Sequence, residues 1–345
     1  MKFLHVVGAR PHFVKLAPLV KEMERNNLEF DICHTGQHYD DSMSSNFFTE
    51  LGIEPPRFQF HNKSFPIKTY PNGNQLYSNM ISGIITDITS IIKDYTDIIV
   101  YGDTITTLAG ALSSTFGGKK LHHIEAGIRC DNFQMPEEKI RRIVDECSDY
   151  LYCLTETDMD NISHVGGTVY LVGDLMYENF LSQDIEDTDK GGYIFVTIHR
   201  EENTRWEQLD SIVNQLNELS LSREIIFPVH PRTLSCMERY GLKLNFEHLD
   251  AISYGEVLSY IKHCDYVVSD SGGVPKEAYW LGKKSVVIME SVVYPQLVEE
   301  KCSVRSDYDN ILESIEKLEE LPEIDDFNLF GDGKTSKRIV EILNG

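Results

Sequence analysis

The sequence predicts an α/β protein with two Rossmann-like domains, each a doubly wound parallel sheet. Short apolar segments alternate with helical patterns, which is typical of parallel sheets covered by helices on both faces. The alternation restarts in the second half, and 345 residues are more than one hydrophobic core commonly organises. We expect the two sheets to face each other across a cleft at the carboxyl ends of their strands, where α/β sheets bind ligands.

The first half begins with a strand at Phe3–Val7, a turn at Gly8 and a helix over Phe13–Glu24. The next segments are expected to form a strand, a helix and two further strands, at Glu29–His34, Thr86–Tyr95, Asp97–Val100 and Lys120–Ile124. Each strand candidate is short, apolar or β-branched, and bounded by Gly or polar residues, as buried parallel strands are.

The second half repeats this pattern, with strands expected at Val169–Leu171, Tyr193–Thr197, Ile225–Val229, Tyr266–Ser269 and Ser285–Met289. We place the domain change near Gly166–Gly167, which gives domains of 1–166 and 167–325. The acidic, turn-rich stretch Gln183–Gly192 is interpreted as a connector. In the final segment, 326–345, the amphipathic helix Ser336–Leu343 is expected to pack back on the first domain.

The charge of the chain restricts its partners. The formal net charge is −23, from 32 Lys and Arg against 55 Asp and Glu. Such a surface repels phosphate polymers, so no nucleic acid is expected as a partner. An anionic ligand must instead be held by a local group of cations, which makes each Arg, Lys and His inside a motif informative.

Cysteine usage and hydropathy indicate a cytoplasmic protein. The cysteines are odd in number and form no CxxC pair, so neither a disulfide framework nor a thiolate zinc site is indicated. The apolar stretch Phe3–Val7 is too short for a signal peptide, and no run is long enough to span a membrane, so no membrane insertion is expected.

The first strand ends in the segment GARPHFVK, which contains Arg10 and Lys15. A glycine turn that opens a helix presents backbone N–H groups to an anion, and these two cations would add to the attraction. The segment has one glycine and is therefore not the GxGxxG fingerprint. Taken alone, a plain turn with two surface cations is the favoured interpretation.

Three carboxylates follow strands or begin a helix in the first half, namely Asp103, Glu125 and Glu138. Asp103 could simply cap the helix that starts near Thr104, and Glu138 could favour the first turn of a helix that begins at Pro136. Convergence of all three on one cleft is harder to explain in that way. Glu137 remains an alternative to Glu138.

Two histidine–cation segments follow strands of the second half. They are TIHREEN, with His199, and VHPRT, with His230 and Arg232. A single histidine is more often structural, but two such segments favour anion binding and proton transfer. There is no HExxH and no close ligand triad, so no metal is expected.

The strongest phosphate signal is the segment SDSGGVPKE. A strand leads into a Gly-rich turn at Ser271, Gly272 and Gly273, followed by a helix with Pro in its first turn. Glu277 lies one helical turn further and could accept hydrogen bonds from ribose hydroxyls. A plain tight turn is the alternative.

Together these segments resemble the non-hydrolysing UDP-N-acetylglucosamine 2-epimerase family. The matching segments follow the family's order over roughly residues 8–282: GARPHFVKLAPL, HTGQHYD, YGDTITTLAGAL, HHIEAGIR, MPEEKIRRIVD, VTIHREEN, PVHPRT and SDSGGVPKEA. GARP, HTGQHYD and VGDLMY are closer to the branch acting on UDP-2,3-diacetamido-glucuronate-type substrates. The resemblance implies a GT-B-like architecture with UDP in the cleft and no cofactor, neither NAD nor a metal, and it suggests a homodimer.

The resemblance also implies an isomerase that inverts C2 of a UDP-N-acetylhexosamine, of the UDP-GlcNAc to UDP-ManNAc type, feeding surface-polysaccharide synthesis. UDP is eliminated to give a 2-acetamidoglucal and is then added back. By position, the catalytic residues are Asp103, Glu125, Glu138 and His199, and the substrate-binding residues include Arg10, Lys15, Ser271, Gly272, Gly273 and Glu277. We add His230 and Arg232 to the substrate-binding set.

The chain departs from the family pattern at several positions. Met289 and Tyr294 replace two arginines, one of which normally helps to hold the diphosphate. His12 replaces a residue that is usually acidic or Gln, and Phe60–Asn74 lacks the usual glycine-rich segment. These changes affect substrate and affinity and leave the fold prediction intact.

Three other functions remain open. A GT-B glycosyltransferase would need an acceptor pocket, for which the sequence shows no apolar patch or basic amphipathic helix. A hydrolysing 2-epimerase has a first loop different from GARPHFVK. A non-catalytic UDP-sugar-binding homologue would not need the four acid/base residues.

Overall fold

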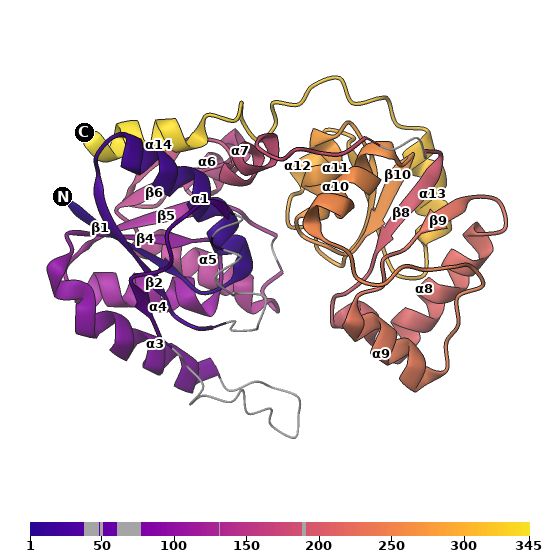
Figure 1. Cartoon of the computed structure of the whole chain (residues 1–345), viewed down its shortest axis with the longest axis horizontal. Coiled ribbons are helices and arrows are strands. Elements are labelled where there is room, and N and C mark those ends of the chain that lie inside the picture. Colours follow the sequence, from indigo (N-terminus) through magenta and orange to yellow (C-terminus); the bar gives the residue numbers. More distant parts are fainter. Residues whose placement is uncertain (38–47, 49–50, 61–76, 131, 188–190) are drawn as a thin grey trace. The chain divides into compact units, whose positions relative to one another are not determined.

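The computed structural model describes residues 1–37, 48, 51–60, 77–130, 132–187 and 191–345. These residues form two compact units, one of Met1–Ser182 with Phe330–Gly345 and one of Gln183–Leu329 (Figure 1). Each is a parallel sheet with helices on both faces, so the predicted fold class is confirmed for both units. Residues 38–40 of HTGQHYD and residues 61–74 of the altered loop lie outside the described part of the chain.

The first unit contains, among its described residues, a seven-stranded sheet in the order β3-β2-β1-β4-β5-β6-β7. Every neighbouring pair is parallel. The strands are β1 (Lys2–Val7), β2 (Glu29–His34), β3 (Phe58–Gln59), β4 (Asp97–Tyr101), β5 (Lys120–Ala126), β6 (Tyr150–Cys153) and β7 (Thr168–Leu171). The order reverses between β1 and β4, which makes this the position where such a sheet binds a ligand.

Two layers of helices cover this sheet. One layer consists of α1 (Arg10–Arg25), α7 (Leu175–Leu181) and α14 (Thr335–Asn344), and the other of α3 (Tyr77–Ile91), α4 (Ile105–Phe116) and α5 (Pro136–Cys147). Short helical segments η2 (Ile92–Asp94) and α6 (Glu156–Asn161) also belong to the described part of the unit. In β1, Phe3 and Val7 pack in the core of the first layer and Leu4 and Val6 in that of the second. This burial on both faces explains why the strands are continuous apolar runs.

The second unit contains a five-stranded parallel sheet within its described residues, in the order β9-β8-β10-β11-β12. The strands are β8 (Tyr193–Thr197), β9 (Glu224–Ile226), β10 (Tyr266–Ser269), β11 (Ser285–Ile288) and β12 (Ser303–Ser306). This is the doubly wound order in which the reversal falls between the first and third strands, here β8 and β10.

Helices again cover both faces of the second sheet. On one face lie α8 (Trp206–Leu219), α9 (Pro231–Tyr240) and α13 (Ile311–Glu319), and on the other α10 (Tyr254–His263) and α11 (Val274–Trp280). The remaining helical segments are η3 (Glu202–Thr204) and α12 (Gln296–Glu299).

The division between the units differs from the predicted boundary at Gly166–Gly167. The strand at Val169–Leu171, expected in the second half, is β7, which pairs with β6 at the edge of the first sheet. The first unit therefore extends to Ser182 before the chain leaves it. The second unit likewise runs to Leu329, beyond the predicted end at residue 325.

The predicted bounds agree with the structure for some strands and not for others. Strands β2, β8 and β10 have the predicted bounds, whereas β3, β6 and β12 were not predicted. The expected strand Ile225–Val229 ends as β9 at Ile226, because Pro228 lacks an N–H and forms only an isolated bridge to Leu249.

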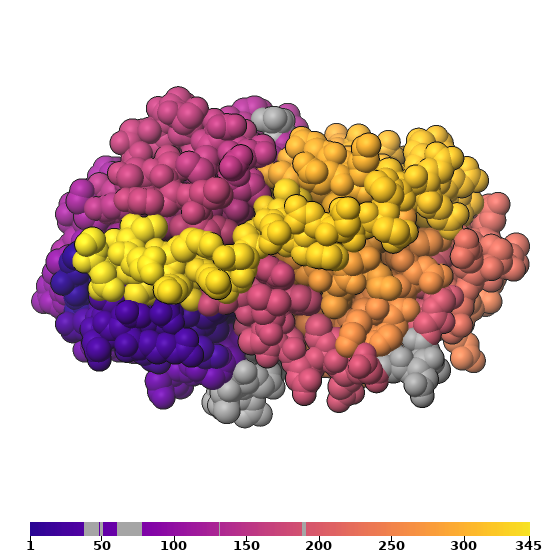
Figure 2. Space-filling model, turned by 90° about the horizontal axis from the view of Figure 1, so that it is seen from above, coloured from indigo at the N-terminus to yellow at the C-terminus, as the bar shows by residue number. Residues whose placement is uncertain are grey.

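The C-terminal helix α14 packs against α1 and α7 of the first unit. Figure 2 shows this yellow helix lying beside the indigo N-terminal segment. Its buried residues include Ile339, Val340 and Leu343, which join the core that contains Phe3 and Phe13. The amphipathic pattern of the terminal segment therefore reflects burial against the first sheet's helices.

We predict that Gly127→Ala destabilises the first unit by about 3 kcal/mol or more. Gly127 follows β5 with a φ of 83°, and a Cβ there would overlap the backbone carbonyl of Asp158. The measurement is chemical denaturation followed by circular dichroism. As a control, Gly166→Ala places its methyl group where no heavy atom lies within 4 Å, so it should change the free energy of unfolding by less than about 0.5 kcal/mol. Equal stability of the two variants would contradict the prediction.

Candidate active site

In the first unit, a buried ion pair joins Lys15 of α1 to Glu125 at the end of β5. The two side chains are 8% and 7% exposed. Glu125 has a φ of 71°, and the register of β5 against β6 shifts at this residue. Because a non-glycine residue in the left-handed region is strained, the fold holds the carboxylate in this place at some cost. A Cβ at Gly102 would lie 3.3 Å from Glu125 Oε2, so the glycine leaves space beside the carboxylate.

Asp103 follows β4 and forms an ion pair with Arg141 of α5. The hydroxyl of Thr104 caps α4 and forms a capping box with Thr107. Asp103 is therefore not the cap that the sequence allowed. Its side chain is 28% exposed, so it remains accessible at the carboxyl end of the sheet.

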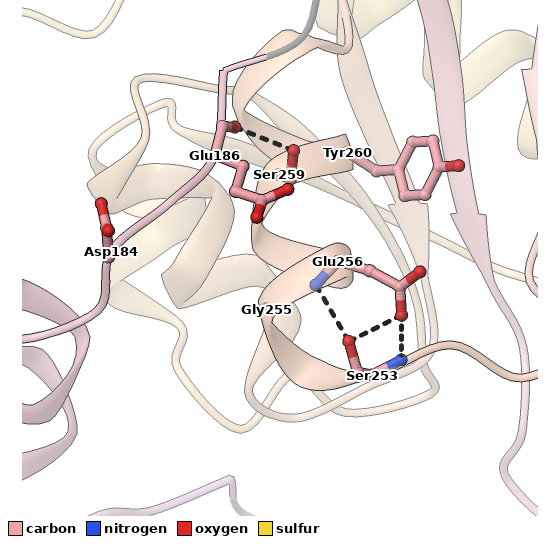
Figure 3. A pocket seen from close by; sticks show the side chains of 7 residues that line it. All are labelled: Asp184, Glu186, Ser253, Gly255, Glu256, Ser259 and Tyr260. Atoms are coloured by element: carbon pink, nitrogen blue, oxygen red, sulfur yellow. Dashed lines mark hydrogen bonds between the residues drawn. The ribbon is translucent and has the colours of Figure 1, made fainter.

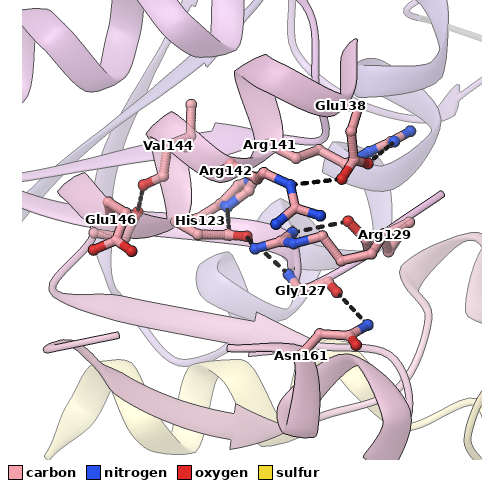
Figure 4. Close-up of polar contacts among 12 residues, drawn as sticks. His123, Gly127, Arg129, Glu138, Arg141, Arg142, Val144, Glu146 and Asn161 are labelled. Carbon is pink, nitrogen blue, oxygen red and sulfur yellow. Dashed lines mark hydrogen bonds and ion pairs between the residues drawn. The ribbon is translucent and has the colours of Figure 1, made fainter. Parts of the chain in front are cut away.

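Glu138 lies in the first turn of α5 and is completely buried, whereas Glu137 is exposed. Its carboxylate accepts hydrogen bonds from Arg142 Nε at 2.8 Å and the Cys130 N–H at 3.1 Å. Arg141 Nη1 lies 3.4 Å from it (Figure 4). Burial raises the pKa of Glu138, but the Cys130 N–H and Arg142 together hold that pKa below its ordinary value. Of the two glutamates, Glu138 is thus the one that contacts Arg141, the partner of Asp103.

A second buried network lies behind these carboxylates and was not predicted. Asp145 is 2.7 Å from His123 Nδ1 and 2.7 Å from Arg129 Nη2, and His123 Nε2 is 2.8 Å from the Gly102 carbonyl. Burial raises the pKa of Asp145, but His123 and Arg129 shift that pKa below its ordinary value. The His123 ring thus bridges the Asp145 carboxylate and the Gly102 carbonyl. The network fixes the turn that precedes Asp103.

The first loop places its predicted cations at the start of α1. Arg10 is the first residue of the helix and is exposed, and the N-cap residue Ala9 provides no side-chain cap. His12 is buried, and its Nδ1 accepts the Gly8 N–H at 3.3 Å. Arg10, Lys15, Asp103 and Glu125 thus lie at the carboxyl ends of β1, β4 and β5, around the reversal of strand order.

In the second unit, His199 follows β8 and lies beside Asp270, which follows β10. His199 Nδ1 is 3.2 Å from Asp270 Oδ1, and Asp270 is completely buried whereas the His199 side chain is 39% exposed. The two residues therefore meet where the order of the second sheet reverses. Sequence reasoning placed Asp270 in the turn motif but assigned it no role.

His230 and Arg232 lie beside this pair, at the start of α9. The rings of His199 and His230 have centroids 5.7 Å apart, and Arg232 Nη1 donates to the His199 carbonyl at 3.1 Å. Partial burial, followed by repulsion from His199 and Arg232, lowers the pKa of His230. The predicted histidine–cation segments therefore come together.

The turn at Ser271, Gly272 and Gly273 forms the expected entry to a helix. The Ser271 hydroxyl accepts the N–H groups of Gly273 at 3.3 Å and Val274 at 3.4 Å. A Cβ at Gly272 would lie 3.7 Å from Arg200 Nη2, so a guanidinium lies next to the turn. Backbone N–H groups beside an arginine are suited to a phosphate.

Glu277 of α11 is buried and hydrogen-bonds with Tyr254. Burial raises the pKa of Glu277 to about 6, although Tyr254 and Lys276 act to lower it. Lys276 is also fully buried, and its Nζ lies 4.1 Å from the ring centroid of Tyr294. The aromatic ring that replaces a family arginine thus contacts a cation instead.

The described residues contain no group of three or more His, Cys, Asp or Glu side chains that could hold a metal ion. A cavity of ≈ 490 Å³ in the second unit has Asp184, Glu186, Ser253, Glu256 and Ser259 in its lining (Figure 3). Its lining contains none of the predicted site residues. The three carboxylates disfavour an anionic ligand, so we do not assign the diphosphate to it.

Comparison with known proteins now identifies the family. The family model described as UDP-N-acetylglucosamine 2-epimerase matches residues 21–344. The chain belongs to this family. Among its relatives, the UDP-2,3-diacetamido-2,3-dideoxy-D-glucuronate 2-epimerase of Pseudomonas aeruginosa is 37% identical, with 99% of each chain covered.

Solved structures of this epimerase family have the same fold. The UDP-GlcNAc 2-epimerase of Methanocaldococcus jannaschii, in complex with UDP-GlcNAc and UDP, aligns with a TM-score of 0.83 and 27% identity over 100% of this chain and 99% of that one. The enzyme from Neisseria meningitidis bound to UDP-GlcNAc aligns with a TM-score of 0.85 and 26% identity over 100% of both chains. The two units are therefore those of a GT-B-like epimerase. No helix among the described residues is long and apolar enough to cross a membrane.

We predict that Glu277→Gln gains stability relative to the wild type as the pH rises. Because the pKa of Glu277 is raised from 4.5 to about 6, its contribution to stability is fully present below pH 4.5 and is lost as the pH rises through about 6. Glutamine does not titrate. The difference in free energy of unfolding should therefore shift by up to about 2 kcal/mol in favour of the variant between about pH 4.5 and 7.5. Urea denaturation at several pH values measures it, and a difference independent of pH would contradict the assignment.

Proposed function

We propose that this chain inverts C2 of a UDP-N-acetylhexosamine by eliminating UDP and adding it back, in the service of surface-polysaccharide synthesis. The observation that carries the proposal is the position of the acid/base groups in a chain of this family. Asp103 follows β4 and His199 follows β8, which are strands at which the order of their sheets reverses, and Glu125 lies at the end of β5, next to β4. These are the positions at which α/β sheets bind ligands.

The reaction requires proton transfer on two faces of one carbon. A base removes the C2 proton while the C1–O bond breaks, which releases UDP and leaves a C1–C2 double bond. Protonation of C2 from the opposite face, with return of a UDP oxygen to C1, completes the inversion. Two acid/base groups are therefore needed. We assign these roles to Asp103, Glu125 and His199, without dividing the two faces among them.

We assign Glu138 a supporting role in this chemistry. Its carboxylate is completely buried and accepts hydrogen bonds from Arg142 and the Cys130 N–H. It also lies next to Arg141, which pairs with Asp103. In our proposal Glu138 acts through Arg141 to hold Asp103, while Lys15 holds Glu125.

The second unit supplies the groups that suit a nucleoside diphosphate. The turn at Ser271–Gly273, with the Arg200 guanidinium next to it, would bind the diphosphate, and His230 and Arg232 would add cationic character. Glu277, one turn into α11, would accept hydrogen bonds from the ribose hydroxyls. Arg10 at the start of α1 would contact the sugar nucleotide from the first unit.

Two substrate classes follow from the relatives. One relative named UDP-N-acetylglucosamine 2-epimerase is 31% identical, and another, named a homolog of that enzyme, is 37% identical. The relative named for a UDP-diacetamido-glucuronate is also 37% identical. We therefore propose the diacetamido-glucuronate as the second candidate substrate. Comparison of kcat/KM for the two nucleotide sugars would decide between them.

We also propose that the enzyme works in the cytosol as a homodimer. All seven cysteines are free, which fits a reducing compartment. The family resemblance suggests the dimer, and light scattering coupled to size-exclusion chromatography would test it.

We predict that the enzyme incorporates one solvent deuterium at C2 when UDP-N-acetylglucosamine is incubated in D₂O, because the proton removed at C2 exchanges with solvent before the other face is protonated. Mass spectrometry and proton NMR of the nucleotide sugar measure the label. Inversion without label would rule out this route. Release of free sugar would instead indicate hydrolysis, and dependence on an added acceptor would indicate a glycosyltransferase.

We predict that His199→Ala and Glu125→Gln each lower kcat by about 10²–10⁴-fold, since each removes an acid/base group. UDP binding, measured by calorimetry, should remain nearly unchanged. His164→Ala and Glu146→Gln are matched controls because both side chains are well exposed, at 65% and 60%, and they should retain full turnover. Loss of UDP binding in both catalytic variants would reassign these residues to the nucleotide site.

A further inference from the structure

Asp270 is a buried carboxylate surrounded by N–H groups of the segment that carries His199. It accepts the backbone N–H of His199 at 3.0 Å and of Arg200 at 2.9 Å, and Asn203 Nδ2 at 3.1 Å. The carboxylate is completely buried. Three donors are thus directed at one anion, which organises the turn between β8 and η3.

The two carboxylate oxygens have different partners. Oδ2 accepts the Arg200 N–H and the Asn203 amide. Oδ1 faces the imidazole, with His199 Nδ1 at 3.2 Å. The backbone N–H of His199 lies between them, at 3.0 Å from Oδ1 and 3.1 Å from Oδ2. One oxygen therefore anchors the turn while the other interacts with the ring.

A carboxylate oxygen 3.2 Å from Nδ1 favours the tautomer with hydrogen on that nitrogen, because the lone pair of an unprotonated nitrogen would repel the oxygen. In the neutral imidazole this places hydrogen on Nδ1 and leaves the lone pair on Nε2. Within the described part of the second unit, Nε2 of His199 forms no hydrogen bond, and the side chain is 39% exposed. Nε2 is thus the ring atom available to a ligand.

We propose that Asp270 is a positioning residue that fixes His199 in the tautomer protonated on Nδ1, so that Nε2 exchanges the proton with the sugar. The tautomer is inferred from the 3.2 Å approach of Nδ1 to Asp270 Oδ1 within the second unit. The catalytic role of this tautomer rests on the epimerase function proposed above. The arrangement is the one in which a buried aspartate orients a catalytic histidine and stabilises its charged form.

The variant Asp270→Asn tests this inference sharply. The amide oxygen is expected to take the place of Oδ2, because Arg200 and Asn203 donate to that position. The amide nitrogen then takes the place of Oδ1 and donates to Nδ1 of His199. The turn is retained, but the proton of the neutral ring moves to Nε2, where it blocks the exchange.

Two-bond ¹⁵N–¹H correlation spectra of the imidazoles at about pH 8 would report the tautomer, with the His199 signal identified by its loss in His199→Gln. We expect the Nδ1–H form in the wild type and the Nε2–H form in Asp270→Asn. The matched variant Asn203→Ala removes a donor to Oδ2 but leaves Oδ1 on the ring, so it should keep the Nδ1–H form. An Nε2–H wild type, or the same tautomer in wild type and Asp270→Asn, would overturn the proposal.

Kinetics would then test the catalytic consequence. Asp270→Asn should lower kcat by about 10²–10⁴-fold with KM within a few-fold of the wild type, since the nucleotide-binding turn is intact. Asn203→Ala should lower kcat by a much smaller factor. If Asp270 acted only as a structural anchor, both variants would lose activity and thermal stability together, and the tautomer would not change.

Different results would contradict the proposed epimerase function and the proposed role of Asp270. A wild-type enzyme without epimerase activity on either candidate nucleotide sugar would overturn the proposed function and with it the catalytic role of Nε2. The imidazole spectra decide independently whether Asp270 sets the tautomer.

Discussion

The constraint on which both half-sites depend is the reversal of strand order in each sheet. In the first unit the chain winds outward from β1 in one direction and from β4 in the other, and in the second unit the reversal falls between β8 and β10. The loops that follow these strand pairs diverge, which leaves space at the carboxyl ends of the strands. Lys15 and Asp103 belong to the first such edge, and His199 and Asp270 to the second.

In both units a buried carboxylate is stabilised by several hydrogen-bond donors. Glu138 and Asp270 are completely buried, and each is surrounded by N–H donors from nearby segments. Unpaired, such charges would be strongly destabilising, but with several donors they fix the local geometry. The more exposed partners, Asp103 and His199, are thereby held in place while remaining accessible.

Cations lie near Met289 and Tyr294, the two positions where the family resemblance implies arginines. Tyr294 provides a ring over which the Lys276 ammonium lies, and the Met289 carbonyl accepts Arg305 Nε at 3.0 Å. Cations therefore remain close to both altered positions. In addition, Arg200 lies next to Gly272. The loss of two arginines from the sequence does not leave this part of the second unit without positive charge.

The sequence by itself determined the alternation of elements, the bounds of strands such as β8 and β10, and the residues that follow them, because burial on both faces imposes continuous apolar runs that end in polar turns. It also contained a usable signal for Glu138, whose partners Arg141 and Arg142 lie three and four residues further along one helix. Other features required the tertiary structure. β7 joined the first sheet through pairing with β6, and Lys15 met Glu125 across 110 positions of sequence. Asp270 likewise meets the His199 segment across 71 positions. These contacts depend on which strands become neighbours, and that is decided by the packing of the whole unit, whereas periodicity and capping act only over a few residues.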